Sequence, residues 1–189
     1  MPRRTDTSLL IDNLLRIITL MSITATALLA PNAIQLFDKP LRKYFKGLDE
    51  QDRQRQLRKA LSYMKYKNLV TDNYEHGLHI TQKAKQRLQK LSFDEIAIPS
   101  PKTWDRKWRI VFFDIPEKQK SSRDGFAAKM RLLGFKVLQR SVFVHPFACR
   151  NEVVRVAMHY HVRNYVSYIE TNHIDNEKVL RQRFKPLLS

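Results

Sequence analysis

A run of basic side chains in residues 53–67 is the feature of this sequence best suited to contact another molecule. The run holds six Lys or Arg residues and no Asp or Glu. At about 100° per residue, its apolar members form one stripe, made of Leu57, Ala60, Leu61 and Met64. The polar face opposite this stripe is suited to neutralise phosphates and to reach base edges in the major groove of DNA. We predict that double-stranded DNA is contacted by Arg53, Arg55, Arg58, Lys59, Ser62, Tyr66 and Lys67.

The alternative interpretation of this run is a basic helix face that is simply solvated. The overall charge favours DNA, because 35 Lys and Arg residues stand against 18 Asp and Glu residues, for a net charge of +17. Residues 1–107 contribute +9 and residues 108–189 contribute +8, so both halves are suited to a polyanion. Since the aromatic residues follow core-like patterns, nucleic acid is favoured over a membrane surface as the partner.

The segment before the basic run is apolar, and we expect it to be a buried helix. Its charge-free part, residues 17–30, has 14 residues, short of the roughly 20 that cross a bilayer. A secretory signal peptide is the competing interpretation, but Pro31 directly follows Ala30, the best small-residue cleavage site. Another helix is expected over residues 33–45, with Ile34 and Phe37 on its apolar face, and Gly47 closes it.

The segment after the basic run completes a winged helix-turn-helix, which we assign to residues 1–95. Residues 69–71 and 78–80 predict the two strands of a wing, joined by a turn. Thr81 is expected to cap a last helix that runs to residue 91, with Lys83, Lys85 and Arg87 pointing outward. Asp49 is expected to cap the basic helix itself, which places that helix directly before the wing.

The second half of the chain predicts a ferredoxin-like domain, so that the fold class is α+β. Residues 96–107 contain Pro99 and Pro101 without an apolar period, which is typical of a linker. Residues 108–174 follow in the order βαββαβ. The strands are expected over residues 108–113, 135–138, 141–144 and 165–169, and the helices over residues 123–133 and 151–160. Residues 175–189 predict a short terminal helix, capped by Asp175, with Val179, Leu180 and Phe184 inward.

Asp114 is the candidate for catalytic chemistry. It follows the apolar strand of residues 108–113, and Pro116 ends that strand because proline donates no hydrogen bond to a ladder. One interpretation is structural: the carboxylate accepts backbone N–H groups and caps the helix beyond Pro116. Glu117 lies three residues further on, past the proline.

The residues 108–174 resemble two known families. Asp114 at the end of the first strand, Gly134 before the second, and a run of Gln139, Ser141, Val142 and Phe143 at the third are similar to the small CRISPR adaptation nucleases, the second of the core Cas proteins. With Asp-Ile-Pro-Glu at residues 114–117, the segment more closely resembles the carboxyl-terminal part of PaaX-type phenylacetate repressors and their winged-helix relatives. The resemblance implies a ferredoxin-like domain that forms a homodimer.

The two resemblances imply different functions. In the nuclease family, the aspartate that matches Asp114 holds a divalent metal across a two-fold axis, which implies Mg²⁺ or Mn²⁺ and phosphodiester hydrolysis. This sequence has Val144, His145 and Pro146 where that family more often shows an acidic residue. PaaX-type proteins keep a similar aspartate while acting as repressors, and DNA binding of that kind requires no cofactor.

Other enzyme classes lack their motifs here. The six histidines show no metal-ligand spacing, and the four glycines are too scattered for a phosphate-binding loop. The single cysteine, Cys149, excludes an internal disulfide and indicates a reducing compartment, so we expect a cytoplasmic protein. We therefore predict a dimeric, PaaX-like DNA-binding regulator, with a CRISPR-type metal-dependent endonuclease or adaptation subunit as the alternative.

Overall fold

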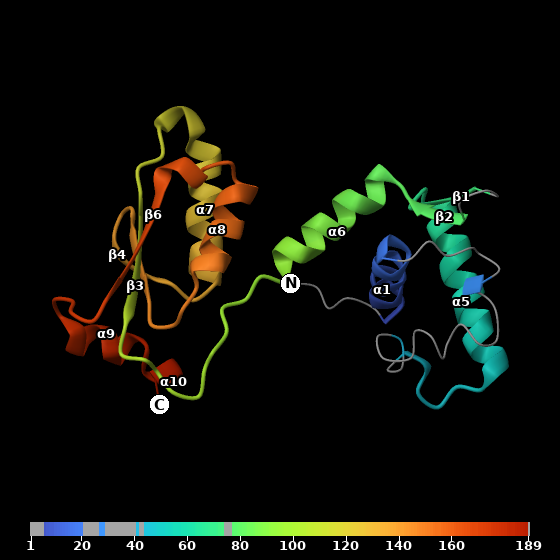
Figure 1. Ribbon diagram of the computed structural model, residues 1–189, viewed down its shortest axis with the longest axis horizontal. Coiled ribbons are helices and arrows are strands. Elements are labelled where there is room, and N and C mark those ends of the chain that lie inside the picture. Colours follow the sequence, from blue (N-terminus) through green and yellow to red (C-terminus); the bar gives the residue numbers. More distant parts are fainter. Residues whose placement is uncertain (1–5, 21–26, 29–40, 42–43, 74–76, 189) are drawn as a thin grey trace. The chain divides into compact units, whose positions relative to one another are not determined.

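The computed structural model divides the chain into two compact units, residues 1–92 and 93–189 (Figure 1). It describes residues 6–20, 27–28, 41, 44–73 and 77–188. Most of the helix expected over residues 33–45, including Ile34 and Phe37, lies outside these described residues.

The first unit has the described element order of a winged helix-turn-helix. Its helices are α1 (Asp6–Leu20), α5 (Glu50–Tyr66) and α6 (Gln82–Asp94), and its strands are β1 (Val70–Asn73) and β2 (Gly77–Ile80). The two strands pair antiparallel, with Val70 opposite Ile80. Thr81 caps α6 as predicted, because its hydroxyl accepts the Ala84 N–H at 3.3 Å. The long basic helix therefore leads directly into the two-stranded wing.

Helix α1 supplies the core of this unit. Its buried side chains are Leu10, Ile11, Leu14, Leu15, Ile17 and Ile18, and they pack with the apolar stripe of α5 and with Leu69 and Leu78 of the hairpin. The prediction of a buried first helix is confirmed for the described residues. Within those residues, no helix has the length and apolar character needed to cross a membrane.

One outward-facing prediction for α6 is wrong. Arg87 points into the unit, where its Nε donates to Asp12 Oδ1 at 2.6 Å and its Nη2 donates to Ser8 Oγ at 3.1 Å. Asp12 is 4% exposed, so its charge would be costly without a cation beside it. The pair joins residues 75 positions apart in the sequence, and helical periodicity gives no signal for such a contact.

The second unit is a ferredoxin-like domain, as predicted. Its strands are β3 (Trp108–Phe113), β4 (Lys136–Gln139), β5 (Val142–His145) and β6 (Val166–Thr171), and its main helices are α7 (Lys120–Leu132) and α8 (Arg150–His159). The sheet order is β4-β5-β3-β6, with antiparallel pairing throughout. Figure 1 shows α7 and α8 side by side along one face of this sheet. Helix α7 begins three residues earlier than expected, directly after the 3-10 turn η1 (Glu117–Gln119).

The two faces of the sheet are covered differently. Under α7 and α8, Val111 and Phe113 of β3 pack with Phe126, Phe143 and Val153. On the other face, Trp108 packs with Val144 and with Leu180 and Phe184 of the terminal helix α9 (Glu177–Arg183). Further along that face, Phe112 is 39% exposed and Ile169 is 48% exposed. One end of this face is therefore covered, while the other end is open among the described residues.

The terminal helix differs in detail from its prediction. Leu180 and Phe184 are buried as expected, but Val179 is 53% exposed. The residue at the N-cap is Asn176 rather than Asp175, and it has a left-handed backbone with φ 59°. Asparagine tolerates this conformation better than most residues, which explains why the helix begins one residue later than the aspartate suggested.

The predicted linker over residues 96–107 is instead packed against the second unit. Ile96 is 6% exposed within the core beneath the helices. Trp104 meets Trp108 edge to face with ring centroids 4.9 Å apart, and its indole N–H donates to Pro146 O at 2.8 Å. The segment lacks apolar residues at regular spacing, and for that reason its sequence predicted a linker. A few large side chains nevertheless fix it to the second unit.

Arg109 fixes the same segment by charge. Its side chain is 3% exposed, and its Nη1 donates to Asp105 Oδ1 at 2.7 Å, to Lys107 O at 2.9 Å and to Pro146 O at 2.7 Å. The hydrogen bond to Arg109 holds the pKa of Asp105 below its ordinary value. A guanidinium buried in this way is compensated mainly by one carboxylate from the segment before β3.

We predict that Asp105→Ala destabilises the second unit. Removing one partner of a fully buried ion pair costs about 3–5 kcal/mol, and we expect about 2–3 kcal/mol here. The smaller figure reflects Asp105, whose side chain is 50% exposed. Both tryptophans of the chain, Trp104 and Trp108, lie in this unit, so urea unfolding followed by tryptophan fluorescence reports on it selectively. Asp175→Ala, the same charge change at an exposed site, is the control, and equal effects of the two substitutions would contradict the prediction.

We also predict a pH dependence that originates at His145. Burial lowers the pKa of His145 from 6.5 to about 4, and Nδ1 accepts the Phe147 N–H at 3.1 Å. The unfolded chain takes up a proton below pH 6.5 that the folded imidazole resists, so stability falls as the pH drops from about 6.5 to about 4. The loss should reach up to about 3 kcal/mol at the lower end. In His145→Gln the urea midpoint of unfolding should change less with pH over this range. An unchanged pH dependence of the midpoint in that variant would refute the assignment.

Candidate nucleic-acid interface

The exposed face of α5 carries most of the residues predicted to contact DNA. The helix begins where Asp49 Oδ1 accepts the Asp52 N–H at 2.8 Å, and its stripe of Leu57, Ala60, Leu61 and Met64 is buried. Burial of this stripe fixes the rotation of the helix about its axis. Solvent then covers the opposite side, where the exposed residues include Arg55, Arg58, Lys59, Ser62, Tyr66 and Lys67.

Three of the six cations already have partners within the protein. Arg53 is half-buried and its Nε donates to Leu48 O at 2.9 Å, so it fixes the turn before the helix. Lys65 Nζ lies 2.7 Å from Asp72 Oδ2 on the wing. Arg55 Nη1 lies 3.5 Å from Asp52 Oδ1, with both side chains well exposed, and such a pair contributes little. Arg53 is therefore structural and Lys65 is held by the wing, while Arg55 exchanges its partner at small cost.

Arg58 and Lys59 are different. Neither makes an ion pair or a side-chain hydrogen bond with any part of the chain that the structure describes. They follow one another on the exposed side of α5, on either side of the line opposite the centre of the buried stripe. These two charges are free to neutralise an external anion.

Tyrosines extend the same surface toward the wing. Tyr66 is 78% exposed and Tyr63 is 41% exposed. Lys67 Nζ lies 5.0 Å from the Tyr66 ring centroid and 5.8 Å from that of Tyr63. Tyr63 is not among the residues predicted from the sequence to contact DNA, because its position on the helix is intermediate between the buried and exposed sides. Two exposed phenol rings beside a cation offer stacking surface and hydroxyl groups to a ligand.

Asp114 lies in the second unit, at the end of β3, and it is exposed. Its backbone N–H donates to Tyr165 O at 3.1 Å. The proposed capping role is wrong, since Pro116 occupies the N-cap of η1 and no side chain caps that turn. Among the described residues, the carboxylate of Asp114 has no hydrogen-bond or ion-pair partner.

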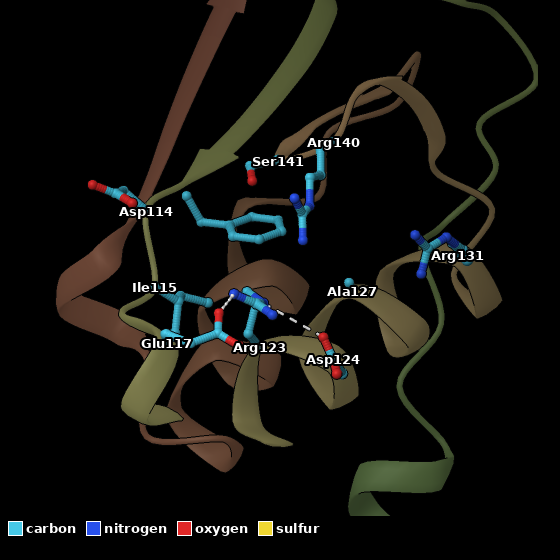
Figure 2. Close-up of a pocket in the computed structure, with 10 residues that line it drawn as sticks. Asp114, Ile115, Glu117, Arg123, Asp124, Ala127, Arg131, Arg140 and Ser141 are labelled. Carbon is cyan, nitrogen blue, oxygen red and sulfur yellow. Dashed lines mark hydrogen bonds and ion pairs between the residues drawn. The ribbon is translucent and has the colours of Figure 1, made fainter. Parts of the chain in front are cut away.

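Glu117 does not join Asp114 in a ligand set. Its Oε2 lies 2.7 Å from Nη1 of Arg123 on α7, and Asp124 Oδ1 lies 3.4 Å from Nε of the same arginine. The hydrogen bond to Arg123 lowers the pKa of Glu117, and that bond also raises the pKa of Arg123. Figure 2 shows Asp114 pointing away from this group. No cluster of three His, Cys, Asp or Glu side chains in the described residues is arranged to hold a metal ion.

One comparison with known proteins, the family model, supports the fold of the second unit. Residues 101–182 match the family model described as the PaaX protein central Cas2-like domain. No curated protein matches the chain. Among solved structures, the "Uncharacterized protein Rv0674 from Mycobacterium tuberculosis" is similar at 18% identity with a TM-score of 0.39; the match covers 95% of this chain and 66% of that one. The predicted resemblance to a PaaX-type protein with a Cas2-like domain is confirmed.

Proposed function

We propose that this chain, whose residues 101–182 match the PaaX protein central Cas2-like domain, is a dimeric transcriptional regulator that binds double-stranded DNA. The single observation that carries the proposal is the exposed face of α5, where Arg58 and Lys59 have no partner within the described residues. That face lies on the helix directly before a two-stranded wing. A helix in this position of a winged helix-turn-helix is the one that enters the major groove.

The residues of this face divide into two kinds of contact. Arg58, Lys59 and Lys67 supply charge for phosphates, which provide most of the affinity but little sequence information. Ser62 and Tyr66 supply hydroxyl groups, and Arg55 can leave its exposed partner Asp52 to make a bidentate contact with guanine. Binding of this kind needs no metal or other cofactor.

A dimer would present two such helices to two half-sites, and the open part of the ferredoxin-like sheet is the surface we propose for it. Phe112 on β3 and Ile169 on β6 face the same side, because Phe112 pairs with Ser167 and Ile110 pairs with Ile169. Leu138 of β4 is also 36% exposed. Apolar side chains of this size on a sheet face are stabilised when a second copy covers them. A two-fold axis through this face would make the contact self-complementary.

A metal-dependent endonuclease is the second candidate, favoured by the free carboxylate of Asp114. One carboxylate per chain supplies too few ligands for a divalent metal, so binding would also require the Asp114 of a second copy. Cleavage of DNA or RNA that requires Mg²⁺ or Mn²⁺ and disappears in Asp114→Asn would establish this activity. Binding of duplex DNA without any cleavage would favour the regulator.

We predict that Arg58→Ala with Lys59→Ala weakens DNA binding at least tenfold and lowers the salt dependence of binding. Each lost phosphate contact reduces the slope of log K against log salt by about 0.9, so the double variant should lose up to about 2. Fluorescence anisotropy with a random-sequence duplex at several salt concentrations measures both quantities. Lys85→Ala with Lys90→Ala removes the same charge from exposed sites on α6 and is the matched control. Equal losses of affinity in both variants would mean that only the net charge of the protein matters, and would contradict an interface on α5.

We predict that Phe112→Glu converts a dimer to a monomer. A carboxylate buried between two apolar sheet faces has no counterion there, so association becomes unfavourable. Light scattering after size-exclusion chromatography gives the mass directly. Met158→Glu, which is on α8 on the opposite side of the sheet and replaces a residue that is 61% exposed, should leave the dimer intact. A monomeric wild-type chain, or a dimer in Phe112→Glu, would exclude this surface.

A further inference from the structure

A cavity of about 430 Å³ opens beside the carboxyl end of β3, between α7 and the turn that joins β4 to β5 (Figure 2). Phe113, Ile115 and Ala127 form its apolar floor, and all three are buried. Its polar lining consists of Asp114, Glu117, Arg123, Asp124, Arg131, Arg140 and Ser141. None of the residues predicted to bind DNA lines this cavity.

The arginines of this cavity are not equally satisfied. Arg123 is paired with Glu117 and Asp124, which leaves Arg131 and Arg140. Neither of these two has an ion pair or a side-chain hydrogen bond within the part of the chain that the structure describes. The guanidinium of Arg131 lies 5.5 Å from the ring centroid of Phe143, and in Figure 2 Arg140 points from the turn toward α7.

The lining carries three arginines and three carboxylates, but Glu117 and Asp124 both bond to Arg123. Arg131 and Arg140 therefore keep N–H donors that no side chain of the described residues accepts from, and an anionic ligand can use them. Two guanidinium groups and the hydroxyl of Ser141 offer only hydrogen bonds of the kind that phosphate oxygens accept in bidentate geometry. A divalent cation would find fewer free ligands here, because Glu117 and Asp124 already bond to Arg123 and only Asp114 remains.

The rim of the cavity selects the size of the anion. Glu117 and Asp124 have side chains that are 71% and 60% exposed, and Asp114 is also exposed. A long polyanion such as duplex DNA would pass close to these carboxylates, whereas a compact phosphate group can enter between Arg131 and Arg140. The apolar floor adds a surface for the uncharged body of the same ligand.

We propose that this cavity binds the phosphate group of a small ligand, held by Arg131, Arg140 and Ser141. The site is separate from the α5 surface, and the proposal does not depend on DNA binding. It gives the ferredoxin-like unit a ligand-binding role in addition to self-association.

The experiment is a calorimetric titration of the full chain with inorganic phosphate, at constant ionic strength with chloride as the balancing salt. We expect saturable binding with Kd near about 1 mM or tighter, equivalent to about −4 kcal/mol. Arg131→Gln and Arg140→Gln should each weaken it at least tenfold. Arg106→Gln, at an exposed position of the same unit with no partner in the described residues, should leave it unchanged.

Each other outcome overturns the proposal. Binding that does not saturate would mean that this cavity is not a phosphate site. Equal affinities for phosphate in all three variants would mean the same. A short duplex used in place of phosphate tests the source of the phosphoryl group. If Arg131→Gln and Arg140→Gln weaken duplex binding while inorganic phosphate does not bind, the ligand is a nucleic-acid backbone rather than a small molecule. Tryptophan fluorescence during urea unfolding checks that each variant folds, and both substituted side chains are exposed.

Discussion

The second unit depends on compensating one buried guanidinium. Arg109 lies on the central strand β3, with β5 on one side and β6 on the other, and it is 3% exposed. Its Nη1 donates to Asp105 and to the carbonyls of Lys107 and Pro146, so one cation joins the segment before the domain to the loop after β5. Because a buried charge without these contacts would be strongly unfavourable, the segment has to pack on the sheet. Earlier in the same segment Ile96 and Ile98 pack in the core beneath the helices, so the boundary between the units falls at residue 92 rather than near the prolines.

This constraint also explains why the sheet has one open and one covered end on the face away from α7 and α8. Trp104 is brought over Trp108 by the same segment, and Arg181 of α9 lies 4.7 Å from the Trp104 ring centroid. Together with Leu180 and Phe184 they cover the end of β3 that carries Trp108. Phe112, four residues along the strand, receives no such cover among the described residues. The apolar surface left open, which we propose for self-association, is thus set by how far the terminal segments reach across the sheet.

The sequence predicted the elements well and the contacts between them poorly. Periodicity identified the apolar stripe of α5, the burial of α1 and all four strands of the sheet, because each depends on residues close in the chain. Arg87 with Asp12, and Arg140 with Arg123 and Arg131, come from separate elements, so their meeting depends on tertiary packing. Asp114 shows the same limit for chemistry: its position at a strand end was predicted, but the arginines around the cavity were not. The composition showed the excess of positive charge, but it did not predict where on the surface the free cations lie.

The placement of that charge distinguishes structural cations from those available to ligands. Arg53, Lys65, Arg87 and Arg109 each bond to a specific carbonyl or carboxylate of the chain, and loss of the less exposed Arg53, Arg87 or Arg109 would lower stability. Arg58, Lys59, Arg131 and Arg140 have no such bond within the described residues. Free cations of this kind add to self-repulsion in a chain of net charge +17. Two surfaces that keep them, on α5 and at the end of β3, are consistent with two anionic partners of different size, and each unit carries one of these surfaces.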